Sequence, residues 1–128
     1  MNSIDTNIIL RFLLNDIPPQ TVRARSLIMN QPVYVSDVVL TETVYVLEQN
    51  LKYDRSFIAK IFRAFLGLPG ILHNDHLLPS VIDLYEKRKA LSFVDCYAAV
   101  EAATFGTNLY TFDKKLLSQG GSHVLAPE

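Results

Sequence analysis

The chain has 128 residues, 49% of them hydrophobic, and a formal net charge of −1. This length predicts one globular domain spanning residues 1–128. A nearly neutral chain has no global basic field, which argues against binding of nucleic acid through bulk electrostatics. No apolar run approaches the roughly 18 residues that a membrane span needs, and the start does not resemble a signal peptide, so we expect a cytoplasmic protein without a membrane partner. The only cysteine, Cys96, excludes an internal disulfide and fits a reducing compartment.

Short segments rich in β-formers alternate along the chain with longer segments of helical period. The first half is expected to contain a strand, two helices, a strand and two helices, at residues 2–4, about 8–15, 21–29, 33–35, 38–50 and 55–66. The prolines at 18 and 19 are expected to separate the first two helices. Ser36-Asp37 and Asp54 are candidate caps for the helices that follow them.

The second half repeats this alternation. We expect a weak strand, two helices, a strand, a short helix and an edge strand, at residues 70–72, 78–89, 92–105, 108–112, from 114 onward and at 124–125. Helices between successive short strands imply a parallel sheet covered on both faces, which is an α/β fold.

Two aspartates directly follow expected strands. Asp5 comes after the first strand, and Asp113 comes after the strand that ends at Phe112. Because ligands bind beyond the carboxyl ends of parallel strands, these two carboxylates lie side by side if their strands are neighbours. Either Asp alone is equally well explained as a helix N-cap.

Glu42 is less easily explained by local structure. On the helix of residues 38–50, the positions one turn away are Val38, Val39, Tyr45 and Val46, so Glu42 is expected on or beside an apolar stripe. A carboxylate that faces a core is costly unless it is paired or binds a metal. The alternative is a Glu at the margin of the stripe that reaches solvent or pairs with an Arg.

Asp95 lies three residues after Ser92, at the start of a helix. This spacing matches the capping-box pattern, although Glu or Gln is commoner than Asp at that place. A first-turn position also suits an anionic group held near the positive end of a helix. Cap and ligand roles remain compatible.

Carboxylates from separate elements are suitable ligands for a hard cation. Mg²⁺ or Mn²⁺ is held by a few carboxylates and keeps waters that a substrate phosphate can replace. Bound cations invert the charge of an acidic cluster, lower the pKa of a bound water and stabilise a leaving oxygen. The four acids therefore predict a metal-dependent nuclease site.

Four short motifs, in this order and spacing, resemble the PIN-domain pattern over nearly the whole chain, and most closely that of the VapC-type toxins of bacterial and archaeal toxin–antitoxin pairs. The motifs are Asp5-Thr6-Asn7, Glu42, Asp95-Cys96-Tyr97-Ala98-Ala99 and Thr111-Phe112-Asp113. The resemblance implies a Rossmann-like fold, with a central parallel sheet of about four to five strands and helices on both faces.

The resemblance also implies a ribonuclease that uses one or two Mg²⁺ or Mn²⁺ ions. Its catalytic and metal-binding residues would be Asp5, Glu42, Asp95 and Asp113, supported through hydrogen bonds by Thr6, Asn7 and Thr111. It further implies a homodimer, inhibited by a cognate antitoxin whose C-terminal segment blocks the pocket. Some relatives carry an extra acid near the third motif, where this chain has Ser92 and Phe93, so a second metal would be weakly held or recruited with substrate.

Other features receive simpler interpretations. Lys114, Lys115 and Arg11 are the candidate contacts to an RNA backbone. His73 and His76 are expected to be exposed loop residues, and Cys96 is expected to be a small core residue. The alternative functions are a PIN-like module that binds RNA or metal without turnover, a chromosomal RNA-processing nuclease, and a phosphotransfer domain. The last is weakened by Asn7, which stands where a phosphatase would have its second Asp.

Overall fold

Five two-residue strands, each parallel to its neighbour, divide into two sheets in the computed structural model of residues 1–128. The strands are β1 (Asn2–Ser3), β2 (Val33–Tyr34), β3 (Ile71–Leu72), β4 (Leu109–Tyr110) and β5 (Val124–Leu125). The first sheet has the order β1-β2-β3, and the second pairs β4 with β5. The predicted α/β class is confirmed, whereas the single central sheet that the sequence predicts is split in two.

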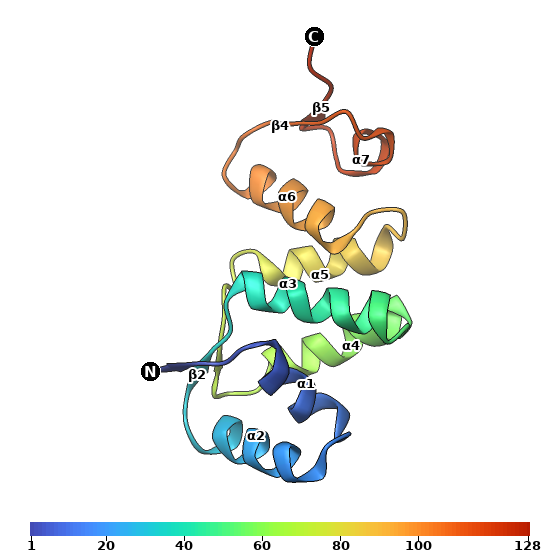
Figure 1. The fold of residues 1–128 in the computed structure, drawn as a ribbon. Coiled ribbons are helices and arrows are strands. Elements are labelled where there is room, and N and C mark those ends of the chain that lie inside the picture. Colours follow the sequence, from blue (N-terminus) through green and yellow to red (C-terminus); the bar gives the residue numbers. More distant parts are fainter.

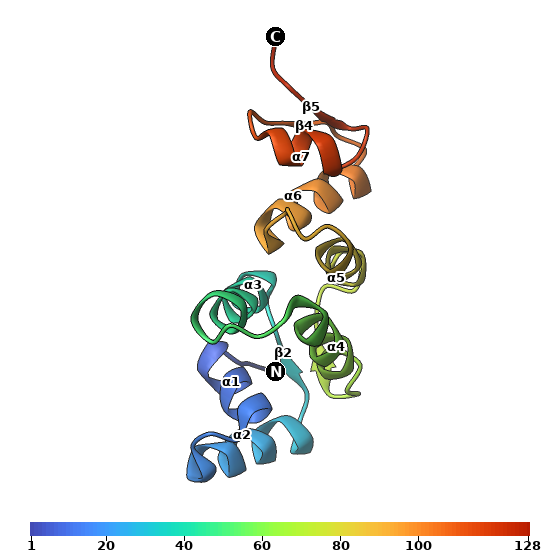
Figure 2. The same ribbon diagram turned by 90° about the vertical axis from the view of Figure 1, so that its right-hand side faces the viewer.

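Seven α-helices and one π-helix connect these strands. They are α1 (Thr6–Leu14), α2 (Pro18–Asn30), α3 (Asp37–Tyr45), η1 (Val46–Asn50), α4 (Arg55–Leu66), α5 (Leu78–Lys87), α6 (Phe93–Thr104) and α7 (Lys114–Gln119). Viewed from the side, α1 and α2 lie on one side of β2 and α4 lies on the other (Figure 2). None of the helices combines the length with the apolar composition that crossing a membrane requires.

The second sheet and α7 form a separate unit at one end of the molecule, which we call the C-terminal unit (residues 107–128). It lies beyond α6, far from β1 and β2, in both views (Figures 1 and 2). The turn that sends it there begins at Gly106, whose positive φ of 69° ends α6. The Gly106 N–H donates to the Ala103 carbonyl at 3.2 Å, and the Thr107 N–H donates to the Ala102 carbonyl at 2.8 Å. This left-handed turn ends α6. The unit that follows is packed against α6 through Leu116, Val124 and the contact of His123 with the Ala99 carbonyl.

The helix boundaries follow the sequence closely, with two differences. The sequence predicts that the prolines at 18 and 19 separate two helices, but α2 begins at Pro18 and includes both. Proline is tolerated in a first turn, where its missing N–H would have no intrahelical partner. The predicted helix of residues 38–50 is also not α-helical throughout, since its last five residues form a π-helix.

The hydrophobic core joins the N-terminal helices to α5 and α6. Its fully buried side chains include Ile9, Leu40, Phe62, Leu78 and Leu91. Each such side chain contributes about 1.5–3 kcal/mol relative to an exposed one. Because the strands are so short, this packing holds the helices and the residues at their ends in place.

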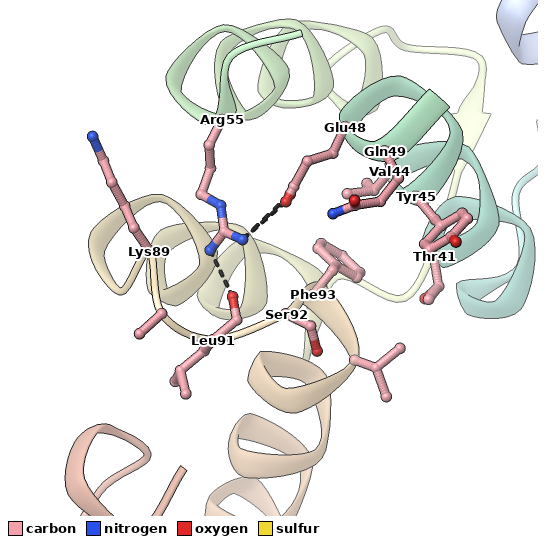
Figure 3. A pocket seen from close by; sticks show the side chains of 12 residues that line it. Thr41, Val44, Tyr45, Glu48, Gln49, Arg55, Lys89, Leu91, Ser92 and Phe93 are labelled. Atoms are coloured by element: carbon pink, nitrogen blue, oxygen red, sulfur yellow. Dashed lines mark hydrogen bonds and ion pairs between the residues drawn. The ribbon is translucent and has the colours of Figure 1, made fainter. Parts of the chain in front are cut away.

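Arg55 fixes the loop that precedes α6. Its Nη1 donates to the carbonyls of Tyr85 at 3.0 Å and Arg88 at 3.1 Å. Figure 3 shows two further contacts, from Nη1 to the Leu91 carbonyl at 2.6 Å and from Nη2 to Glu48 at 2.9 Å. The guanidinium also lies 4.0 Å from the centre of the Tyr85 ring, and the Tyr85 hydroxyl donates to Glu48. The ion pair is largely shielded, with side-chain exposures of 13% for Arg55 and 19% for Glu48. One side chain therefore ties η1, α4, α5 and the start of α6 together.

We predict that Arg55→Ala lowers the free energy of unfolding by roughly 3 kcal/mol, because it leaves a shielded carboxylate and three carbonyls without their donor. The matched control is Arg63→Ala, whose ion pairs with Asp83 and Glu86 lie on the surface and are worth less than about 1 kcal/mol. Urea denaturation of the two variants measures both losses. Equal losses in the two variants would contradict the structural role given to Arg55.

The reactivity of Cys96 reports how tightly α6 is packed. The side chain is fully buried, as the sequence predicts for a core residue, and this burial raises the pKa of the thiol to about 12. At pH 8 the group is therefore a neutral thiol, and thiolate is the species that alkylates. We predict that iodoacetamide leaves the native protein unlabelled at pH 8 and labels one thiol per chain in 8 M urea. Rapid labelling of the native protein would show that α6 is not packed as described.

Candidate functional site

Asp5 occupies the turn between β1 and α1. It is the N-cap of α1, and its Oδ1 accepts a hydrogen bond from the Ile8 N–H at 3.1 Å. The carboxylate is exposed at the edge of an open cavity of about 930 Å³, which Asn7 also lines. Oδ2 takes no part in the cap, so Asp5 holds its helix and keeps an oxygen for another partner.

Thr6 connects this turn to α3. The side chain is buried, and its hydroxyl accepts a hydrogen bond from the Thr43 hydroxyl at 3.4 Å. Thr43 follows Glu42 directly, so this contact joins the segment that carries Asp5 to the segment that carries Glu42. The sequence predicts a supporting role for Thr6, and this geometry is compatible with it.

Glu42 lies beside the apolar stripe of α3, as expected, but this side of the helix is exposed. The core side of the helix is formed by Leu40, Thr43 and Val44, whereas Glu42 is exposed. Its neighbours on the apolar stripe are exposed too, Val38 by 79% and Tyr45 by 61%. Of the two interpretations of Glu42, the structure shows the glutamate that reaches solvent, because α3 buries its other side against α1.

The apolar surface around Glu42 continues onto α6. Val38, Tyr45, Val94 and Tyr97 line, with Glu42, an open cavity of about 500 Å³. Asp95 is adjacent in sequence to Val94. Glu42 thus lies at the contact of α3 with α6, while the Thr43 hydroxyl reaches toward α1.

Asp95 forms the capping box that its spacing from Ser92 predicts. The Asp95 N–H donates to the Ser92 hydroxyl at 3.0 Å, and the Ser92 N–H donates to Asp95 Oδ2 at 3.2 Å. The side chain is half-buried in the first turn of α6, where the helix dipole favours a negative charge. Its Oδ1 is left free by the cap.

Asp113 caps α7 in the C-terminal unit. Its Oδ1 accepts from the Leu116 N–H at 2.8 Å, and its own N–H donates to the Thr111 hydroxyl at 3.0 Å. Asp113 is exposed, as are Lys114 and Lys115 in the first turn of α7. The unit that carries it lies at the end of the molecule opposite to α2, beyond α6 (Figure 1).

The four acids do not form one cluster in the single chain. No group of three or more His, Cys, Asp or Glu side chains is placed to hold a metal ion together. Their chemistry suits a hard cation, since three of them keep one carboxylate oxygen outside the cap. Their placement does not, since Asp5, Glu42 and Asp95 form no such group and Asp113 belongs to the C-terminal unit.

Asp37 begins α3, shortly after the end of β2. The sequence does not predict the environment of its side chain. Its Oδ2 accepts from Asn74 at 2.9 Å and from the Tyr97 hydroxyl, while its Oδ1 is buried without a partner. Burial, followed by the hydrogen bond to Asp37, raises the pKa of Tyr97, so this phenol stays protonated. In the sequence, the only indication that Asp37 belongs to a polar site is its position just after a strand.

His73 differs from expectation. It is half-buried, and its Nδ1 is shielded from solvent without a hydrogen-bond partner, whereas His76 is exposed as predicted. His73 directly follows β3, whose two residues Ile71 and Leu72 pair with Val33 and Tyr34 of β2. The prediction of an exposed loop residue is therefore wrong for His73.

Arg11 is the only predicted RNA contact near Asp5. It lines the same cavity, but its guanidinium is already bound to Asp16 at 3.0 Å and to Gln20 at 2.8 Å. Arg23 also lines this cavity and is exposed. Positive charge therefore lies on the rim near Asp5, away from Lys114 and Lys115 of the same chain.

Comparison with known proteins identifies the family. The family model described as PIN domain matches residues 3–121, a range that includes all four predicted acids. No curated protein matches the chain. PIN domains are generally nucleases, which hydrolyse phosphodiester bonds, and they generally use divalent metal ions. Because the match covers nearly the whole sequence, the chain belongs to the PIN domain family.

Proposed function

We propose that this protein is a metal-dependent endoribonuclease and the toxin of a type II toxin–antitoxin pair. The observation that carries the proposal is the common design of Asp5, Asp95 and Asp113. Each lies at the start of a helix, where one carboxylate oxygen accepts a hydrogen bond from a backbone N–H and the other oxygen takes no part in the cap. In a chain of the PIN family, this supports their use as ligands in addition to caps.

The proposed reaction is hydrolysis of an RNA phosphodiester bond. The oxygen of water attacks phosphorus in line, the bond from phosphorus to the 3′ oxygen breaks, and a proton passes to that oxygen. The products are a 5′-phosphate and a 3′-hydroxyl. Mg²⁺ or Mn²⁺, as one ion or two, is the cation that the oxygen ligands favour.

The proposed RNA contacts are basic side chains near the acids. Lys114 and Lys115 follow Asp113 directly and are exposed, so they can meet phosphate groups beside that carboxylate. Arg23 lies on the rim of the cavity next to Asp5. Because the whole chain has a net charge of −1, attraction of RNA depends on such local groups of basic side chains.

The proposed protein partners are a second copy of the chain and a cognate antitoxin. The resemblance to VapC-type toxins supports both. A short reading frame for a DNA-binding protein immediately upstream of this gene, together with co-purification of its product, would support the toxin role. A gene without such a neighbour would favour a chromosomal RNA-processing nuclease.

We predict that Asp5→Asn and Asp95→Asn each lower metal-dependent cleavage of RNA by more than ~100-fold, since even groups that merely support a metal ligand are worth 10- to 100-fold. Asn keeps the capping ability of Asp, so the variants should stay folded. The matched control is Asp83→Asn, an exposed acid on α5, which should cleave at the wild-type rate. Wild-type activity in all three variants would disprove the assignment of the acids.

We predict that removal of divalent cations with EDTA abolishes cleavage and that Mn²⁺ or Mg²⁺ restores it. Binding of a cation to the folded state alone should also raise the free energy of unfolding, by about 2.7 kcal/mol at a concentration 100 times Kd. Calorimetry with Mn²⁺ separates binding from turnover. Binding of Mn²⁺ without any cleavage would favour the alternative of a module without turnover, and cleavage in EDTA would contradict metal dependence.

A further inference from the structure

Exposed aromatic side chains line one side of the C-terminal unit. Burial alternates along the extended segment that begins with β4, since Leu109 and Thr111 are half-buried, whereas Tyr110 is 60% exposed and Phe112 is 86% exposed. Residues two apart on an extended segment lie on the same side of it. Tyr110 and Phe112 therefore share the exposed side.

Neither ring has a partner within the chain. Both lie outside the hydrophobic core, and neither forms a pair with another aromatic ring. The backbone that carries them is held in place, because the N–H groups of Leu109 and Thr111 donate to the carbonyls of His123 and Leu125, both at 3.0 Å. Two aromatic rings on an ordered backbone are thus presented to solvent.

Two free cations continue this exposed surface. Lys114 and Lys115 are exposed, and none of the ion pairs in the chain involves them. Between Phe112 and Lys114 stands Asp113, whose Oδ2 takes no part in the cap of α7. Aromatic rings, positive charge and a free carboxylate oxygen therefore occur together within residues 110–115.

This combination matches the chemistry of unpaired nucleotides. Bases that are not paired stack on exposed Tyr and Phe rings, while Lys side chains bind the phosphates between them. Residues two apart on a strand are separated by about 6.6 Å, so each ring can take a base of its own. In a duplex the faces of the bases are already stacked on one another, so a duplex offers these rings no free base.

A protein partner fits the same surface less well. Lys is depleted in protein–protein interfaces, and two lysines adjoin the rings here. The apolar cavity beside Glu42 differs in this respect, because no Lys or Arg is among the residues that line it. Charge complementarity therefore favours a polyanion with free bases at the C-terminal unit.

We propose that residues 110–115 form a stacking platform for two unpaired bases of the RNA substrate. Tyr110 and Phe112 each stack on one base, and Lys114 and Lys115 bind the phosphates beside them. The platform rests on the proposed function for the identity of its ligand as substrate, since it adjoins the carboxylate of Asp113. It makes these two aromatic residues determinants of where an RNA is bound.

Binding without turnover tests the platform. In EDTA and at low ionic strength, fluorescence anisotropy follows a labelled oligoadenylate of six nucleotides. The matched ligand is an abasic ribose phosphate chain of the same length and charge. We expect oligoadenylate to bind at least ~10-fold more tightly, since the stacking of each base strengthens binding by roughly 5- to 150-fold. Equal affinity for the two ligands would overturn the proposal.

Variants of the rings separate stacking from apolar contact. Tyr110→Ala and Phe112→Ala should each weaken the binding of oligoadenylate by roughly 10-fold and leave that of the abasic chain unchanged. Phe112→Tyr should keep the affinity, whereas Phe112→Leu, which is apolar without a ring, should lose it. The matched control is Phe105→Ala, an aromatic residue 68% exposed at the end of α6, which should bind as the wild type does. Wild-type affinity in Phe112→Ala and Phe112→Leu would contradict stacking.

Variants of the lysines test the phosphate contacts. The double change Lys114→Ala and Lys115→Ala should reduce the slope of log K against log salt concentration by about 1.4, since each phosphate contact to a single strand contributes about 0.7. Lys60→Ala, an exposed lysine of α4, should leave the slope unchanged. An unaltered slope in the double variant would overturn the role of the lysines.

Assays of cleavage keep this proposal apart from the proposed function. A wild type that binds oligoadenylate through the platform and cleaves no RNA would overturn the proposed function alone. A wild type that cleaves RNA and binds oligoadenylate no better than the abasic chain would overturn the platform alone. A changed oligomeric state of Phe112→Ala, with unaltered binding of oligoadenylate, would assign the rings to a protein contact and also overturn the platform.

Discussion

Packing between helices is the main source of stability in this fold, because each strand contributes only two paired residues. Two residues supply few ladder hydrogen bonds, and a sheet of this kind is stable only under cover. The cover is a core that runs from Ile9 in α1 through Leu40 in α3 to Leu91 before α6. The positions of the functional side chains therefore follow from how helices meet, and only secondarily from the sheet.

Helix α3 carries Glu42 and contacts the helices that begin at Asp5 and near Asp95. It contacts α1 through the hydrogen bond between Thr43 and Thr6, and it meets α6 around the cavity that Glu42 and Val94 line. Arg55 fixes the loop before α6 through three backbone carbonyls. The first turn of α6 is consequently held from two sides. Such support is what a site needs when its ligands come from separate elements.

Local features of the fold could be predicted from the sequence. The capping box of Ser92 and Asp95 follows from their spacing, and the caps at Asp5 and Asp113 follow from residue type and place. The end of α6 at Gly106 follows from the preference of glycine for positive φ. These features depend on contacts within a few residues, which the sequence displays directly.

Features that depend on distant contacts could not be predicted. The side of α3 that is buried depends on which helices cover it, and the apolar residues around Glu42 gave no indication that they are exposed. The separation of β4 from β1 depends on the packing of the C-terminal unit against Ala99 and its neighbours in α6. The partial burial of His73 follows from the place of β3 beside β2, which its polar loop context conceals.

The double use of the aspartates has an evolutionary consequence. Asp5, Asp95 and Asp113 stabilise their helices whether or not the protein acts on a substrate, because each caps a helix N-terminus. Glu42 is exposed and makes no cap, so nothing in the folding of α3 preserves it. A lineage that lost its activity would retain capping residues such as Asp, Asn or Ser at these three positions and would be free to replace the glutamate. In comparisons among descendants of this chain, the residue at position 42 would therefore be the most informative about whether the activity persists.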